Sequence, residues 1–431
     1  MLNALIYTEL VITFPESGSD YVYIREGFGS CAAFLYNWVF IFAENAGRAV
    51  VALTFSKYLC STIFLNCSPP EELITLVAAL ALTAVVFIQC YSTRFTIMTS
   101  NFFTATKLLG LLLIMGIGLA RVVTKGVPPS EKFLTGTSSD LGDYVLGFYA
   151  AYWAYSGTNV AVNVVEEVKL PLKPNMVFST ISAMLTITGV YLLTNLAYVS
   201  VLSYPQILAS PAVAFTFGAA SLPGFLAWVM PFFVACSTFG GMSNGMMVWA
   251  RVGMAASRQG HLPKVFSLLQ TEWLTPIPSL LLGLFMSLLM MVSSKLYSLI
   301  QYTSYISVLG SALSVVTLLR FRFQYPEMKR EFSLPILVPL AYLLISSFLL
   351  IYPFYSNPIN TCICFGIISL GLPLYFLLIV PEEKPEILKK ADAIVNNTFQ
   401  KLFLCLQEDF ESVDYKNKTD QGHDNPNFTS S

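Results

Sequence analysis

Long apolar segments follow one another along most of this sequence, and each is about as long as a lipid bilayer is thick. A helix needs roughly 20 consecutive apolar residues to cross the hydrocarbon core. Segments of this kind, joined by short polar connections, occupy residues 31–60, 72–92, 96–120, 143–165, 176–203, 221–250, 276–294, 298–319, 333–353 and 359–380. The sequence therefore predicts an all-α polytopic protein that crosses the lipid bilayer about ten times.

The composition argues against several other classes of protein. Charged residues make up 11% of the chain, whereas soluble domains carry about 25%. The formal net charge of −1 gives no reason to expect a nucleic-acid partner. The 8 cysteines form no CxxC pair, and neither His261 nor His423 lies in an apolar run. We therefore expect no metal site and no cofactor, and without a nucleophile–base set we do not expect an enzyme.

The basic residues of the loops predict which side of the membrane each loop faces. Lysine and arginine collect on the cytoplasmic side, and the loops follow this rule best when residues 15–30 face the cytoplasm. Residues 1–14 are apolar but too short to cross the bilayer. We interpret them as the inner part of a span whose beginning is absent, as in a fragment.

The C-terminal residues differ in composition from the rest of the chain. Residues 382–431 are polar and charged, and we expect them to form a cytoplasmic tail. Within it, 389–407 is expected to be an amphipathic helix at the inner membrane surface. The run Asn425 to Phe428 reads NPNF, a turn-forming motif of the kind that endocytic adaptor domains bind. A motif of four residues also arises by chance.

The apolar segment 143–165 is interrupted in the middle by Ser156, Gly157, Thr158 and Asn159. In hydrocarbon, non-helical backbone is tolerated only where it lines a protein-enclosed cavity. Glycine lowers the cost of unwinding, and the polar side chains can pair freed backbone groups. The carbonyl end of one half-helix suits an ammonium group, and the amide end of another suits a carboxylate. An α-amino acid carries both charges. The alternative is a glycine kink packed against a neighbouring helix.

Isolated charges within the apolar segments are further candidates for function. Lys107 lies alone in a deeply apolar run, where a charge is costly and by default a functional hypothesis. It could instead extend to the inner membrane surface. Glu44 and Arg48 are four residues apart on one helix face, so they mark either a polar path or a self-neutralised pair.

A group of charges is predicted at the cytoplasmic mouth of the protein. Glu166 and Glu167 follow the interrupted segment, and they could pair with Arg25 or Arg251 to form an inner gate. The alternative is a solvated helix end.

Several stretches together resemble one family. They are residues 7–29, 64–72, 105–113, 153–171, 192–202, 207–218 and 257–263. Their order and content resemble the light, transporting subunits of the heteromeric amino-acid transporters, in the amino acid–polyamine–organocation superfamily. The L-type and y+L-type branches look most similar. The resemblance implies a LeuT-like inverted repeat of twelve spans, of which 1–14 would be part of the second and 15–381 the remaining core.

The resemblance also implies roles for individual residues. Backbone carbonyls at Trp153, Ala154 and Ser156 would hold the substrate amino group, and the Trp153 ring would close over the substrate. Asn159 would flank the same site. Lys107 matches a position near the ion site of sodium-coupled relatives, where a fixed ammonium group fits sodium-independent exchange.

A covalent partner is implied as well. Cys67 matches the cysteine that bridges to a single-span glycoprotein heavy chain. It lies in a loop predicted to face the oxidising exterior, where an odd thiol suggests an intermolecular disulfide. Cys60 is the rival for this bridge, and an internal 60–67 disulfide is the structural alternative.

Three departures from the family pattern affect the prediction. The first span, which in the family supplies the amides for the substrate carboxylate, has no counterpart, so the chain as given is not expected to transport. The connection after Glu167 reads LPLKPN instead of the usual NP…NLP run, and Val308 replaces a pocket tryptophan of the L-type branch.

The predicted function follows from these residues and the resemblance. Ser156 and Asn159 are neutral where some cation-transporting relatives place an aspartate. We therefore predict sodium-independent exchange of neutral amino acids at the plasma membrane, by alternating access, as the light chain of a disulfide-linked heterodimer. One alternative is y+L-type exchange of cationic for neutral amino acids. An alternative of another class is a truncated, non-transporting regulator of the heavy chain.

Overall fold

The computed structural model describes residues 1–407 except for 17, 65–68, 127–136, 158–161, 163–164, 166–167, 169, 211, 224–225, 227, 274, 293–295, 328–329, 357 and 382–385. The helices are α1 (Leu2–Thr13), α2 (Asp20–Phe28), α3 (Ser30–Ile63), α4 (Glu71–Tyr91), α5 (Thr93–Lys125), α6 (Leu141–Ala154), α8 (Leu172–Val201), α9 (Tyr204–Ala209), α10 (Val213–Ser221), α11 (Val229–Arg258), η4 (Lys264–Ser267), α12 (Ile277–Met291), α13 (Leu296–Gln324), α14 (Leu337–Ser356), α15 (Pro358–Leu378) and α16 (Glu386–Phe403). The two strands are β1 (Leu268–Gln270) and β2 (Cys405–Gln407). The predicted helical fold is thereby confirmed.

Six helices in this described part of the chain are long and apolar enough to cross a membrane, namely α3, α4, α5, α8, α13 and α14. A helix also lies in each of the other predicted segments. The helix α6 ends at Ala154, just before the interruption predicted within residues 143–165. The helix α11 begins at Val229, later than the predicted 221, with Pro231 in its first turn. Proline is tolerated there because no helical hydrogen bond is lost.

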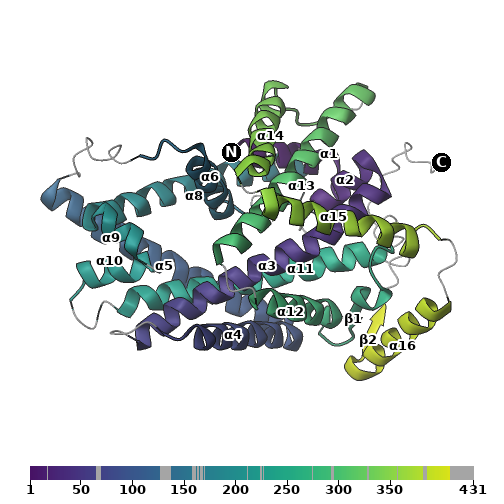
Figure 1. The fold of residues 1–431 in the computed structure, drawn as a ribbon, viewed down its shortest axis with the longest axis horizontal. Helices are drawn as coiled ribbons and strands as arrows, with labels where there is room; N and C mark the ends of the chain where they lie inside the picture. Colours follow the sequence, from purple (N-terminus) through teal and green to yellow (C-terminus); the bar gives the residue numbers. More distant parts are fainter. Residues whose placement is uncertain are drawn as a thin grey trace.

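The long helix α3 lies at the centre of the molecule. It packs against α11, α13, α4, α12, α15 and α2, and Figure 1 shows it crossing the middle of the view beside α11, with α4 and α12 below. The helix α11 does not reach the hydropathy of a typical span, because residues 237–245 read STFGGMSNG. These small and polar residues allow close approach to α3 and α5.

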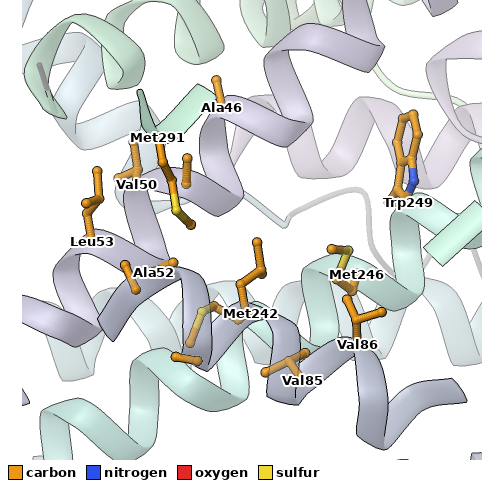
Figure 2. Close-up of a cluster of buried hydrophobic side chains, with 14 of the residues drawn as sticks. Ala46, Val50, Ala52, Leu53, Val85, Val86, Met242, Met246, Trp249 and Met291 are labelled. Carbon is orange, nitrogen blue, oxygen red and sulfur yellow. The ribbon is translucent and has the colours of Figure 1, made fainter. Parts of the chain in front are cut away.

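The largest buried cluster takes most of its side chains from four of these helices, and Leu299 adds α13 to it. Figure 2 shows Ala46, Val50, Ala52 and Leu53 of α3 facing Val85 and Val86 of α4, Met242, Met246 and Trp249 of α11, and Met291 of α12. The Trp249 indole donates a hydrogen bond to the Ser279 carbonyl at 2.9 Å. A β-carbon on Gly283 would come within 2.7 Å of the Trp249 ring, so glycine is required where α12 meets this side chain. The cluster holds α3, α4, α11 and α12 together as one packed unit.

A buried ion pair connects α1 with α13. The Glu9 side chain is fully buried, and both its oxygens accept hydrogen bonds from the Arg322 Nη2, at 2.6 and 2.5 Å. The backbone N–H of Leu334 donates to the second oxygen at 2.9 Å. Bidentate pairing with an additional donor is the geometry in which a buried ion pair is best compensated for desolvation.

The start of the tail packs against the loop between α11 and α12. The strands β1 and β2 pair antiparallel, with Leu268 opposite Gln407 and Gln270 opposite Cys405. Buried side chains of Val265, Leu268 and Cys405 form a small core with Phe399 and Phe403 of α16. A helix is present in the predicted 389–407 region, but this two-stranded pair was not predicted. Its strands have three residues each, which is too short for a recognisable alternation.

Candidate functional site

The interrupted segment forms a true helix break. The helix α6 ends at Ala154, and Tyr155, Ser156 and Gly157 form a turn. Gly157 has φ +103°, in the region that favours glycine. The sequence predicted a break at Ser156, and the helix ends two residues earlier. Thr158 and Asn159 lie outside the described residues.

The last carbonyl groups of α6 accept hydrogen bonds from within the protein. The Trp153 carbonyl accepts from the backbone N–H groups of Tyr155 and Ser156, the latter at 3.0 Å. The Ala154 carbonyl accepts a hydrogen bond from the Tyr191 hydroxyl of α8 at 2.6 Å. A carbonyl oxygen has two lone pairs, so the Ala154 oxygen can accept a second donor. Ala154 and Ser156 are exposed.

Trp153, in the last turn of α6, packs against α3. Its side chain is half-buried and packs against the cluster of Figure 2. A β-carbon on Gly47 of α3 would lie 2.9 Å from the Trp153 Cη2 and 3.6 Å from the Thr303 Cγ2 of α13. The absence of a side chain at residue 47 therefore makes the space that the indole occupies.

A chain of hydroxyl groups begins one residue before Trp153. The Tyr152 hydroxyl and the Ser311 Oγ of α13 are 3.0 Å apart, and the same Ser311 oxygen lies 3.0 Å from the Tyr7 hydroxyl of α1. Tyr7 in turn donates to the Asp20 carboxylate at the start of α2. These contacts connect the end of α6 with α13, α1 and α2.

Asp20 lies at the end of this series of hydroxyl groups, and sequence analysis missed it. Its carboxylate also accepts hydrogen bonds from the Ser314 Oγ at 2.6 Å and the Tyr36 hydroxyl at 3.1 Å. The residue is buried, and burial raises the pKa of the Asp20 carboxyl group although these hydroxyl donors oppose the change. Its partners come from distant helices, so nothing local in the sequence could have indicated it.

Glu44 and Arg48 form the pair that their spacing allowed. The closest nitrogen and oxygen are 3.6 Å apart. The Arg48 guanidinium also donates to the Asn45 Oδ1 at 2.8 Å and to the Gly245 carbonyl of α11 at 3.1 Å. Its Cζ lies 5.3 Å from the centre of the Trp249 ring. Arg48 is thus embedded between α3 and α11.

The structure describes three other predicted site residues, and the glutamates predicted to pair with two of them lie outside the described residues. Lys107 is exposed on α5. Arg25 of α2 forms ion pairs with Glu16 at 3.2 Å and Glu26 at 2.9 Å. Arg251 is half-buried on α11.

Several predicted residues lie outside the described residues. They are Glu166 and Glu167 of the inner gate, Cys67, and the motif from Asn425 to Phe428. The rival Cys60 is a buried free thiol, with its Sγ 3.8 Å from the Ser56 Oγ.

The ring of His261, in the loop after α11, contacts polar side chains through both of its nitrogens. Its Nδ1 is 2.8 Å from the Tyr21 hydroxyl, and its Nε2 is 2.9 Å from the Ser30 Oγ. Burial lowers the pKa of His261, and the nearby Arg25 lowers it further. Across the described ranges, no three His, Cys, Asp or Glu side chains are grouped so that they could hold a metal ion.

Comparison with known proteins gives consistent matches over nearly the whole chain. Residues 1–381 match the family model described as amino acid permease. The human large neutral amino acids transporter small subunit 2 is 36% identical over 418 residues, which is 95% of this chain and 77% of that protein. The human Asc-type amino acid transporter 1 is 33% identical, covering 89% of this chain and 74% of the relative. The human cystine/glutamate transporter is 32% identical, covering 95% and 81%.

Proposed function

Because the chain belongs to the amino acid permease family, we propose that this multi-pass membrane protein exchanges neutral amino acids across the plasma membrane by alternating access. The observation that carries the proposal is the end of α6 at Ala154, followed by a turn with Gly157 in the left-handed region. A break within a membrane helix leaves backbone polar groups that are satisfied only in a protein-enclosed polar site. A zwitterionic substrate supplies the partners that such a site needs.

The end of α6 suits the amino group of the substrate. The last carbonyls of a helix carry the negative end of its dipole. The Ala154 oxygen accepts a hydrogen bond from the Tyr191 hydroxyl, and its second lone pair can accept an ammonium group. The Trp153 oxygen accepts from two backbone N–H groups, so it would have to exchange one of them for the substrate. The Ser156 carbonyl and the Asn159 side chain would complete this part of the site. The Trp153 ring, which rests against Gly47, would cover the bound amino acid.

The substrate class follows from the absence of charge in the turn. Tyr155, Ser156 and Gly157 are all neutral, and a buried cationic side chain would need a counter-charge. One relative is named for large neutral amino acids and another for cystine and glutamate. Because these relatives share a family, local side chains must decide the substrate. This supports neutral amino acids for the present chain.

A heavy chain is the proposed partner. The name of one relative identifies it as a small subunit. The helix α3 ends at Ile63 and α4 begins at Glu71, so Cys67 belongs to the short connection between them. The burial of Cys60 favours Cys67 as the bridging thiol. We place this connection on the extracellular side and the tail in the cytoplasm, where its NPNF motif could meet an adaptor.

Two further proposals concern the closure of the cytoplasmic side and the independence of exchange from sodium. Arg25 and Arg251 would pair with Glu166 and Glu167 when the cytoplasmic side closes. Lys107 would supply the fixed positive charge that makes a sodium ion unnecessary. Both proposals rest on the family resemblance and on the position of these residues along the chain.

The proposed function is tested by exchange in proteoliposomes that contain a single-span heavy chain and the protein with the first span that the family resemblance requires for the substrate carboxylate. Vesicles are loaded with leucine, and uptake of labelled leucine is measured with and without sodium, in competition with arginine. We expect leucine uptake that depends on internal leucine, is unaffected by sodium and resists arginine. Sodium-dependent uptake, or competition by arginine, would favour the y+L-type alternative. No exchange by the folded heterodimer would overturn the proposal.

A further inference from the structure

Glu44 lies on α3 between the face covered by Trp153 and the face that contacts α11. Gly47, about one turn further along, is the residue against which the Trp153 ring rests. Arg48, one residue beyond, reaches the Gly245 carbonyl of α11. Residues three and four apart are neighbours on a helix surface, so Glu44 projects between these two contacts. Its side chain is 31% exposed, whereas that of Arg48 is 3% exposed.

The hydrogen-bonding capacity of Glu44 is unused although its charge is balanced. The Arg48 Nη1 and Nη2 donate to Asn45 and Gly245. The 3.6 Å separation between Arg48 and Glu44 is a charge contact and is too long for a good hydrogen bond. The Glu44 carboxylate accepts no hydrogen bond from any residue that the structure describes. A partly exposed acceptor, one turn of α3 before the residue that the Trp153 ring contacts, is therefore left open.

We propose that Glu44 is a specificity residue that accepts a hydrogen bond from the side chain of the substrate. The inference rests on the proposed function and narrows its substrate class to neutral amino acids with an N–H or O–H donor, such as glutamine, asparagine and serine. Arg48 balances the carboxylate, so a cationic side chain gains little net attraction. An anionic side chain would meet the carboxylate directly and be repelled.

The expected size of the effect follows from the type of bond. Hydrogen bonds to charged groups are stronger than neutral ones, and losing such a bond lowers affinity by about tenfold or more. Leucine has no side-chain donor and serves as the internal reference. The glutamine-to-leucine ratio therefore isolates Glu44 from general damage to the site.

The test compares two variants that remove the carboxylate in different ways. Glu44→Gln keeps the shape but leaves Arg48 buried without its counter-charge, so this variant can fail to fold. Glu44→Leu combined with Arg48→Met removes both charges and replaces them with apolar side chains of similar size, a change that buried ion pairs often tolerate. Glu71→Gln is the matched control, because Glu71 is exposed in the first turn of α4.

The measurements are exchange kinetics in proteoliposomes and ligand-induced thermal shift in detergent, each with glutamine and with leucine. We expect the glutamine-to-leucine ratio of kcat/KM to fall about tenfold in the folded Glu44 variants and to stay constant in Glu71→Gln. An unchanged ratio in the apolar double variant would overturn the proposal, as would a selective loss of lysine or arginine. If the unmodified protein shows no exchange and no thermal shift with either glutamine or leucine, the proposed function itself fails. That result differs from a failure of the Glu44 proposal, which concerns only the glutamine-to-leucine ratio.

Discussion

The indole of Trp153 rests on Gly47, so close that a β-carbon at residue 47 would lie 2.9 Å from the ring. This contact sets the position of the residue that precedes the break in α6. Gly47→Ala should displace the indole, at a cost of about 1–3 kcal/mol in packing or in substrate binding. We expect the KM for leucine to rise.

Gly116→Ala on α5 is the control for this change, because a β-carbon there would meet no atom within 4 Å. Leucine kinetics should remain unchanged in Gly116→Ala. Equal KM values in both variants would show that the position of Trp153 does not govern substrate binding.

Removing one member of the buried Glu9–Arg322 ion pair should destabilise the protein more than removing the charges of both. Arg322→Met leaves the fully buried Glu9 without its partner, and we expect a loss of about 3–5 kcal/mol. Adding Glu9→Gln removes the uncompensated charge and retains an acceptor for the Leu334 N–H, so most of the loss should be recovered. Thermal unfolding in detergent measures both variants. A double variant as unstable as the single one would contradict the role of the pair.

The environment of His261 predicts a pH dependence of stability. The folded state disfavours its protonation, since burial and Arg25 lower the pKa of His261. The unfolded chain takes up a proton near the ordinary pKa of about 6.5, so stability should decrease as the pH falls below that value. The unfolding temperature between pH 5 and 7.5 should vary less in His261→Gln. Identical slopes in both proteins would rule out His261 as the source.

The proposed disulfide between Cys67 and the heavy chain can be tested directly. On a non-reducing gel, Cys67→Ser should abolish the linked species with the heavy chain. The buried Cys60 should not replace it, so Cys60→Ser should leave the linked band intact. A linked band that persists in Cys67→Ser and disappears in Cys60→Ser would reverse the assignment.

Sequence reasoning predicted the helices well and the connections between them poorly. Apolar length is a local property, so a helix was found in every predicted segment, and Ser156-Gly157 was enough to locate the break. The Asp20 network could not be foreseen, because it joins hydroxyl groups from α1, α3 and α13 that are far apart in the chain. The pairing of β1 with β2 was also missed, since each strand is very short. The pairing of Glu44 with Arg48 followed from spacing, but the contact of Gly47 with Trp153 could be seen only from the packing of α3 against α6.

The central claim is that the unwound turn at Gly157 forms the substrate site, and leucine exchange by Gly157→Ala tests it most directly. Alanine at φ +103° is strained, and Gly126→Ala, at φ +80° and ψ 170°, places a strained residue in open space at the end of α5, away from the turn. We predict that Gly157→Ala loses at least tenfold in leucine exchange while Gly126→Ala, of similar thermal stability, retains it. Undiminished exchange by a folded Gly157→Ala would contradict the account.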